Sequence, residues 1–320
     1  MALAFLPQQI FEALENLDLT LKVQEVPEIG QLLNDTLLLR GKKIRPTLLF
    51  LMGQVFRVPL GKLQPYARAA EWVHAATLAH DDVIDESAIR RSRPTLNAQS
   101  SNIRAVLAGD LLFARVMSEL SALGNVVLIH GLALTVEALV GGEWLQLNAR
   151  GVIDVDRDHL ELVARKKTAS LMSWCCSTAA HLAGLDPQVC LDCAYLGEVL
   201  GISFQMADDI IDYCDSGDKP FAQDLKEGLV NFVTLEMLQA NSDLRKPVEE
   251  ILRGEYLQST WPWQEVELRG ACDLVSNLSR SKLQLAEAIF EKIVQTLKDP
   301  DCEAIQAMWS TLDYLKARVS

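Results

Sequence analysis

The residues best suited to chemistry form one pattern that occurs twice: two adjacent aspartates, two β-branched residues and a third aspartate. The six aspartates are Asp81, Asp82 and Asp85 in the first copy, and Asp208, Asp209 and Asp212 in the second. Residues four apart on a helix lie on one side, so the first and third aspartate of each copy are expected to point the same way. Adjacent like charges repel, and a divalent cation relieves the repulsion. Because carboxylate oxygen ligands suit Mg²⁺, we predict that all six are metal-binding residues.

Basic residues accompany these acids. Arg90, Arg91 and Arg93 follow the first acidic pattern, and guanidinium groups bind phosphate oxygens as forks. Further clusters are Lys42-Lys43-x-Arg45, at an expected helix start that favours anions, and Arg165-Lys166-Lys167. Since Mg²⁺ usually completes its shell with water and substrate phosphates, the combination indicates a metal–diphosphate complex. The alternatives are solvated acidic helix ends, a solvated basic turn and an ion-paired loop.

Length and composition limit the class of protein. The 320 residues are 49% hydrophobic and only 6% aromatic, which favours one large all-α domain over residues 1–320. A formal net charge of −13 argues against a nucleic-acid partner. The 7 Cys lack the spacing of a disulfide framework, so we expect reduced thiols in a cytoplasmic protein. We find no signal peptide and no run of about 18 uninterrupted apolar residues, and therefore expect no transmembrane segment.

Helical periodicity runs almost throughout, and no convincing strand pattern interrupts it. The first acidic pattern ends a predicted helix, and His74, two turns before Asp81, is either a core residue or a functional one. Asp156 or Asp158 is expected to cap the helix that leads to Lys167. The strongly apolar helices are either buried or line an apolar cavity. The predicted helices that matter here are 8–22, 27–39, 47–55, 66–86, 101–122, 126–149 and 188–213.

Taken in chain order, these motifs resemble those of the trans-isoprenyl (polyprenyl) diphosphate synthases, in particular long-chain, octaprenyl-like members. The matching residues extend from Gly41 to Gly228 and cover more than half of the chain. They are Gly41-Lys42-x-x-Arg45-Pro46, Glu71-x-x-His74, the first acidic pattern with Arg90-Arg91, Ala108-Gly109-Asp110, Lys167-Thr168, Gln205 and the second acidic pattern. The resemblance implies an isoprenoid synthase helical bundle around a deep central cavity, a homodimer, and three Mg²⁺ per active site.

The resemblance also implies a role for each matching residue in a prenyl transfer between isopentenyl diphosphate and an allylic prenyl diphosphate. The residues expected to be catalytic are Asp81, Asp85, Arg90, Lys167 and Asp208. Arg90, Lys167 and Lys219 would hold the allylic diphosphate, and isopentenyl diphosphate would be held by Lys42, Arg45, His74 and Arg91. Thr168 and Gln205 complete the substrate-binding residues.

The implied reaction is a head-to-tail condensation in isoprenoid biosynthesis. Metal and bases stabilise the charge on the leaving diphosphate, so that the allylic C–O bond ionises. The double bond of isopentenyl diphosphate then attacks the allylic cation, and a proton is lost to the departing diphosphate. The chain shows no Ser-His-Asp or Cys-His arrangement, and this reaction needs no protein nucleophile.

Product length is expected to depend on the residues one helical turn before the first acidic pattern. Related short-chain enzymes place aromatic residues there, whereas this chain has Ala76 and Thr77. Small side chains leave a product tunnel open, so we predict an octaprenyl-like product, between hexaprenyl and decaprenyl. A farnesyl or geranylgeranyl diphosphate synthase is the alternative among shorter-chain enzymes.

Three positions depart from the family pattern. Leu229 stands where the family usually has Lys, Asp218 stands where a Gly usually precedes the loop Lys, and Ser92 replaces the common Gly after the paired Arg. They motivate a second hypothesis, a catalytically poor subunit of a heteromeric prenyl synthase. Losing one charge-assisted contact costs about 1.5–3 kcal/mol, and all six motif aspartates remain, so we expect an active enzyme. A class I terpene cyclase would normally replace the second acidic pattern by an Asn/Ser/Glu triad.

Overall fold

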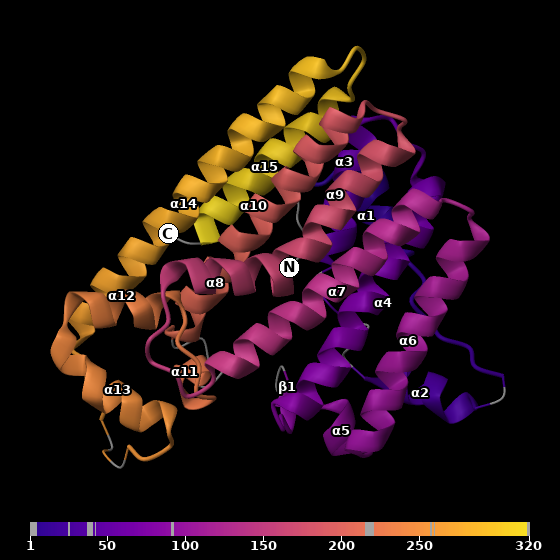
Figure 1. Ribbon diagram of the computed structural model, residues 1–320. Helices are drawn as coiled ribbons and strands as arrows, with labels where there is room; N and C mark the ends of the chain where they lie inside the picture. Colours follow the sequence, from indigo (N-terminus) through magenta and orange to yellow (C-terminus); the bar gives the residue numbers. More distant parts are fainter. Residues whose placement is uncertain are drawn as a thin grey trace. The chain divides into compact units, whose positions relative to one another are not determined.

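The computed structural model describes residues 5–24, 26–36, 41, 43–90, 93–214, 221–256, 258 and 260–318. It divides into two compact units (Figure 1). The first unit consists of residues 1–136, 171–195 and 291–311, and the second of 137–170, 196–290 and 312–320. Several long helices contribute residues to both units, and one domain over 1–320 stays a prediction.

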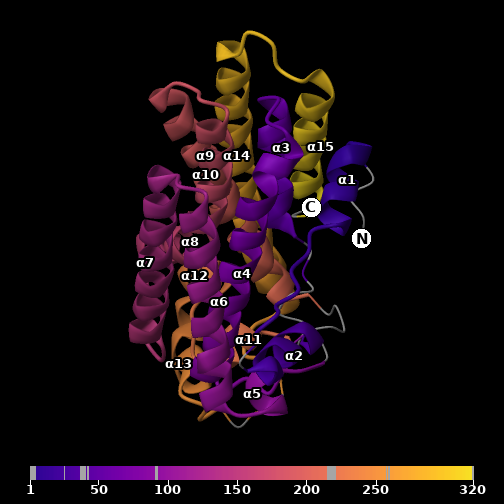
Figure 2. The ribbon, with the colours of Figure 1, turned by 90° about the vertical axis from the view of Figure 1, so that its right-hand side faces the viewer.

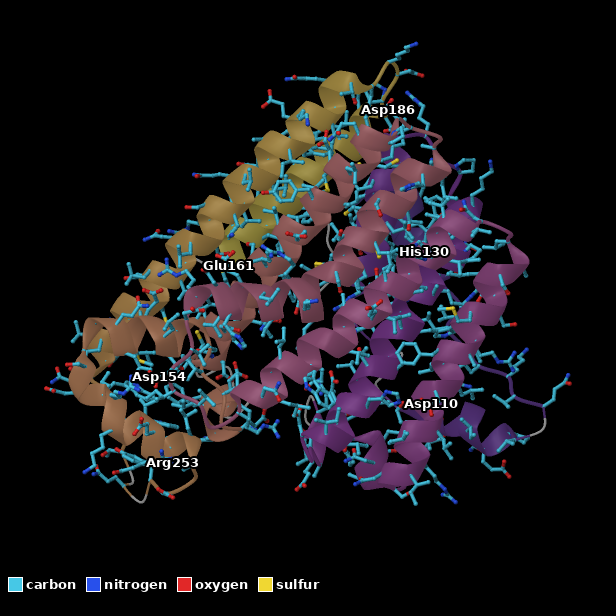
Figure 3. All side chains as sticks on the ribbon, viewed as in Figure 1. Asp110, His130, Asp154, Glu161, Asp186 and Arg253 are labelled. Atoms are coloured by element: carbon cyan, nitrogen blue, oxygen red, sulfur yellow. The ribbon has the colours of Figure 1, made fainter. Side chains whose placement is uncertain are left out.

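The first unit is built around two long helices, α4 (Leu60–Ile84) and α6 (Asn102–Ala122), which lie side by side in Figure 1 and Figure 2. Gly109 on α6 allows the close approach, because a Cβ there would lie 2.3 Å from Nε2 of His80. The same ring nitrogen lies 3.5 Å from the carboxylate of Asp110, which is labelled on α6 in Figure 3. The remaining helices in this part of the chain are α1 (Gln8–Glu15), α2 (Pro27–Asp35), α3 (Ile44–Val55) and α5 (Leu96–Gln99).

The N-terminal helices are shorter than predicted, and α4 begins earlier. The helix predicted over 8–22 ends at Glu15, because Leu17, Leu19 and Leu21 are buried at alternating positions of a non-helical segment. Helix α4, which was predicted to begin at position 66, begins at Leu60, and Pro65 lies inside it. Helices α6 and α7 (Val126–Ala149) have the predicted bounds within one residue.

A short ladder interrupts the helices after the first acidic pattern. Strand β1 (Ile89–Arg90) pairs antiparallel with β2 (Arg93–Pro94), and Arg90 lies opposite Arg93. Thr95 connects the ladder to the segment that follows α4 by two hydrogen bonds. Its amide donates to Ala88 O at 3.0 Å, and its hydroxyl donates to Ser87 O at 2.7 Å. Two-residue strands carry no alternation of polarity, so the sequence pattern did not reveal them.

The second unit begins with the C-terminal part of α7 and continues through α8 (Arg157–Ala164). Asp156 caps α8 by accepting the His159 amide at 2.8 Å, as one of the two predicted caps. A π-helical turn, η2 (Arg165–Ala169), connects α8 to α9 (Ser170–Leu182). The helices that follow α9 are α10 (Pro187–Asp212), α11 (Gln223–Lys226), α12 (Phe232–Ala240), η3 (Ser242–Leu244), α13 (Arg245–Leu252), α14 (Glu265–Thr296) and α15 (Cys302–Arg318).

Aromatic packing closes the core of the second unit. The rings of Trp261 and Trp263 stack with centroids 4.9 Å apart, and Phe221 lies 5.3 Å from Trp261. Tyr213, one residue after the second acidic pattern, packs edge-on against Trp263 and shares a 2.5 Å hydrogen bond with Thr234. Figure 3 shows Glu161 on α8, whose carboxylate binds Lys282 of α14 at 2.8 Å. The end of α10 is therefore anchored by buried rings.

Two helices, α7 and α10, are long and apolar enough to cross a membrane when judged by length and composition. Counting uninterrupted apolar residues did not identify them. Helix α10 is 61% buried over its most apolar window, as expected for a core helix, whereas the corresponding window of α7 is 28% buried. The prediction that α7 is either buried or lines a cavity does not cover its whole surface, because the side chains of Val126, Val127 and Leu134 are exposed.

Candidate active site

The first acidic pattern occupies the end of α4 and separates into two kinds of carboxylate. Asp81 and Asp85 are partly exposed, and Asp85 is the C-cap residue of the helix. Asp82 points to the other side and is only 1% exposed. The predicted common orientation of the first and third aspartate agrees with this difference in burial. Two oxygen-bearing side chains are therefore accessible on successive turns of α4.

Asp82 holds Arg90, the first basic residue of the following ladder. Its Oδ1 accepts from Nε of Arg90 at 2.8 Å and lies 2.8 Å from the same residue's Nη2, while Oδ2 is buried and has no hydrogen bond to a residue that the structure describes. Burial raises the pKa of Asp82, and the guanidinium opposes this rise. The buried carboxylate orients a predicted diphosphate-binding cation beside the two accessible aspartates.

The start of α3 lies beside the middle of α4. A Cβ added to Gly41 would lie 3.6 Å from Oε2 of Glu71, which is buried. Arg45 is partly buried in the same neighbourhood, where its charge and that of Glu71 both act on the Cys175 thiol, whose pKa burial raises. His74 lies one turn beyond Glu71 and is partly exposed. The structure therefore brings the Gly41–Pro46 motif to Glu71-x-x-His74, as the resemblance implies.

Ala76 and Thr77, the predicted chain-length residues, lie one turn before Asp81. Ala76 is completely buried, whereas Thr77 is partly exposed and donates its hydroxyl to His74 O at 2.9 Å. Their role in product length stays a prediction. Other predicted residues fall outside the described part of the chain, namely Lys42, Arg91, Lys219 and the departures at Ser92 and Asp218.

The second acidic pattern ends α10, and its three aspartates differ from those of the first. Asp208 is partly exposed, whereas Asp209 and Asp212 are both buried. Asp212 accepts the amides of Gln223 at 3.1 Å and Asp224 at 3.2 Å, and so caps the start of α11. Asp212 differs from Asp208 in burial because the returning chain covers the Asp212 carboxylate.

Asp209 belongs to a hydrogen-bonded chain that reaches the π-helical turn. Thr168 of this turn donates to Gln205 at 2.7 Å, and Gln205 donates to Oδ1 of Asp209 at 2.9 Å. The amide of Phe232 donates to Oδ2 at 3.1 Å. Burial raises the pKa of Asp209 well above its ordinary value, and the nearby charge of Asp224 adds to the rise. Three residues predicted separately are therefore brought together in one network.

Lys167 lies in the π-helical turn, and such turns often occur at functional sites. Its ammonium group pairs with Glu143 on α7, a residue that the sequence reading gave no role. Glu143 is 8% exposed, and its neighbour Gly142 packs directly against the turn. The adjacent Gly and acid within an apolar helix were the available signal, but their partner comes from a distant part of the chain.

The donor atoms fit a hard divalent cation that is shared with a substrate. Asp81 and Asp85 in one unit and Asp208 in the other offer partly exposed carboxylates. Among the residues that the structure describes, no three or more His, Cys, Asp or Glu side chains form a ready metal cage. Mg²⁺ commonly binds to one or two carboxylates and takes its other oxygens from water and phosphates. Asp81 and Asp85 in the first unit, and Asp208 in the second, each present the type of oxygen donor that such an ion takes.

The all-α units, each with an Asp-Asp-x-x-Asp pattern at a helix end and a held cation nearby, define the isoprenoid synthase fold class. The sequence profile of the polyprenyl synthetase family matches residues 26–260, and the chain belongs to this family. A decaprenyl diphosphate synthase from Rhodobacter capsulatus has the same fold, with a TM-score of 0.79, 25% identity and coverage of 98% of this chain and 97% of that one. The predicted fold class and resemblance are confirmed.

Sequence relatives include long-chain synthases. Component 2 of the heptaprenyl diphosphate synthase of Geobacillus stearothermophilus is 37% identical over 209 residues, which cover 64% of this chain and 64% of the relative. Across the first three relatives, the match spans 48–64% of their own length. A geranylgeranyl pyrophosphate synthase structure from Corynebacterium glutamicum, complexed with calcium and isoprenyl diphosphate, has a TM-score of 0.76 and 25% identity, covering 98% and 96% of the two chains.

Proposed function

We propose that this protein is a prenyltransferase, a trans-polyprenyl diphosphate synthase that condenses isopentenyl diphosphate onto an allylic diphosphate with Mg²⁺. The observation that carries the proposal is the matching family profile over residues 26–260, which includes both acidic patterns and every predicted diphosphate-binding residue. The accessible carboxylates and the held cations Arg90 and Lys167 support it.

The chain's own residues would bind and orient the allylic diphosphate. Asp81, Asp85 and Asp208 hold its metal, while Arg90 and Lys167 bind the remaining oxygens as preorganised cations. When bound, Mg²⁺ supplies positive charge that stabilises the leaving diphosphate. The calcium and isoprenyl diphosphate in the Corynebacterium structure support a divalent cation, and three Mg²⁺ per site is part of the proposal.

Arg45 and His74 would hold isopentenyl diphosphate beside the start of α3. After the C–O bond to diphosphate breaks, the double bond of isopentenyl diphosphate attacks the allylic cation, and a new C–C bond forms. The proton lost from isopentenyl diphosphate goes to the departing diphosphate. The balance of charge and atoms requires no protein nucleophile.

A long product is the second element of the proposal. Relatives with names such as heptaprenyl, decaprenyl and octaprenyl diphosphate synthase support it, together with the small side chain of Ala76. We expect an octaprenyl-like chain, between hexaprenyl and decaprenyl.

The test is an assay with Mg²⁺, isopentenyl diphosphate and farnesyl diphosphate, with product length read by mass spectrometry. A ladder ending near eight units supports both the reaction and the open tunnel. A product of three or four units keeps the reaction but contradicts the length prediction. No product from folded protein favours the catalytically poor subunit that Leu229 motivated. Asp208→Ala is the matched variant, and its turnover should fall by orders of magnitude.

A homodimer is also proposed. Consecutive helices α6 and α7 expose large apolar side chains, and those on the two helices are Ile103, Val106, Leu107, Val126, Val127, Leu134, Val140 and Trp144. Asp110 and His130, both labelled in Figure 3, are exposed on the same helices, so these surfaces are mixed rather than lipid-like. Such apolar side chains are typical of an interface between protein subunits. Light scattering of wild type and Leu107→Asp should show a dimer that the variant weakens, and a wild-type monomer that assembles only with a second protein would contradict it.

The proposed location is the cytoplasm. All seven cysteines are free thiols, and Cys175, Cys176 and Cys193 are completely buried. Unpaired thiols are typical of a reducing compartment. Fractionation of cells with an antibody against the native protein tests the location, and recovery with the membrane pellet after a salt wash would contradict it.

A further inference from the structure

Lys167 is held by a carboxylate that belongs to neither acidic pattern. Its ammonium group pairs with Oε2 of the buried Glu143 carboxylate, which has no other hydrogen-bond partner among the residues that the structure describes. A buried carboxylate is costly unless an opposite charge compensates it, so the ion pair with Lys167 carries the compensation. Glu143 is therefore placed to determine where the ammonium group lies.

A close approach of the backbone of α7 to the π-helical turn brings the two side chains together. A Cβ at Gly142 would lie 2.8 Å from Lys166 Cβ, 2.8 Å from Lys167 Cγ and 2.9 Å from the Lys167 amide nitrogen. No other residue type fits at that distance without moving the π-helical turn. Glycine thus lets α7 approach the turn closely enough for Glu143 to reach Lys167.

The turn is fixed from its other side as well. Gly201 of α10 contacts Ala169, and Thr168 donates to Gln205 at 2.7 Å. The backbone around Lys167 is therefore fixed, but a lysine side chain has four flexible bonds of its own. Only Glu143 restrains the far end of that side chain among the contacts described for it.

We propose that Glu143 is a positioning residue, which holds the Lys167 ammonium group where the allylic diphosphate binds. The inference rests on the proposed function, since that function gives Lys167 its diphosphate. Preorganisation lowers the entropy lost when the diphosphate binds, so removing the anchor weakens binding of the substrate that Lys167 contacts. Isopentenyl diphosphate was assigned to other residues and should be little affected.

The test compares wild type with Glu143→Gln, which keeps the side-chain size and removes the charge. We expect KM for the allylic diphosphate to rise about 10-fold to 100-fold, the usual effect of losing a charge-assisted contact, with KM for isopentenyl diphosphate unchanged. Calorimetric binding of inorganic diphosphate with Mg²⁺ should weaken by a similar factor. A general folding defect would instead lower the apparent kcat, because fewer molecules are active, and would leave both KM values unchanged.

Two further variants exclude indirect effects. Glu143→Asp keeps the charge but is one methylene shorter, so it should recover only part of the diphosphate affinity, and it keeps the inference testable even if the Gln variant folds poorly. In a Lys167→Met background, Glu143→Gln should no longer reduce affinity, because a positioning residue acts through its partner. Equal losses in both backgrounds, or an unchanged allylic KM, would overturn the inference. If wild type forms no product, the proposed function fails, and calorimetry still decides the role of Glu143.

Discussion

A glycine in α10 provides the most direct test of how the π-helical turn is positioned. A Cβ at Gly201 would lie 2.3 Å from Ala169 Cα, 2.5 Å from its Cβ and 3.0 Å from its nitrogen. Two of these atoms belong to the backbone of the turn, so Gly201→Ala forces α10 and the turn apart. The change should reach Thr168, whose hydrogen bond to Gln205 spans the same contact.

The size of the effect follows from two opposing contributions. Overpacking of this kind costs up to about 3 kcal/mol, while replacing Gly by Ala within a helix favours folding by about 1 kcal/mol. The expected net loss is thus about 2 kcal/mol. Gly270 in α14 is a matched control, because nothing lies within 4 Å of its added Cβ. Gly270→Ala should gain about 1 kcal/mol from helix propensity alone.

Differential scanning calorimetry of both variants measures the contrast. A difference of about 3 kcal/mol corresponds to roughly 6 °C between the two Tm values for a chain of this size. We also expect Gly201→Ala to lower turnover, since the displaced turn carries Lys167, and Gly270→Ala to keep wild-type turnover. Gly201→Ala with a Tm raised as much as in Gly270→Ala would refute the close contact.

Three other predictions follow from particular contacts. Ala76→Phe should shorten the product measured by mass spectrometry, provided that calorimetry shows a folded variant, and an unchanged ladder would contradict the proposed length control. Asn231 caps α12, since its Oδ1 accepts the Thr234 amide at 3.0 Å. Asn231→Ala should therefore lower the free energy of unfolding by about 1–2 kcal/mol and Tm by a few degrees. An unchanged Tm would contradict a stabilising role of this cap. The Lys292 ammonium group lowers the pKa of Asp192 below 3.8, which stabilises the fold above that pH and ceases to do so as pH falls through the lowered value. Asp192→Asn should therefore lose up to ~1 kcal/mol at pH 7 and nothing at very low pH, and equal losses at both pH values would count against the ion pair.

Much of the fold could be predicted from the sequence because helical periodicity is a local property. Helices α6 and α7 were bounded within one residue, since both are long and strongly apolar. The two-residue strand that holds Arg90 gave no periodic signal, and the leucines after Glu15 suited a helix as well as an extended segment. What decided those cases was burial against distant parts of the chain, which a local pattern does not contain.

The candidate site shows the same limit at the level of single side chains. Spacing predicted that the first and third aspartate share a side, and Asp81 and Asp85 do share partial exposure. The identical spacing did not predict the burial of Asp212, because the chain returns after α10 and supplies two amides to that carboxylate. Periodicity gives the direction of a side chain on its helix, but the element packed against that direction decides whether it meets water or a partner.

Carboxylates that look equivalent in the sequence therefore have different roles, according to whether they are exposed or buried. The buried carboxylate of Asp82 pairs with Arg90 through one oxygen, and the buried carboxylate of Glu143 pairs with the ammonium group of Lys167. The two cations Arg90 and Lys167, which the family resemblance assigns to the allylic diphosphate, are therefore each paired with a buried acid. The arrangement suits a reaction whose demand is electrostatic, because a cation fixed in advance needs no reorganisation when charge develops on the leaving group. The accessible aspartates remain available for the metal, and the buried acids orient the bases beside them.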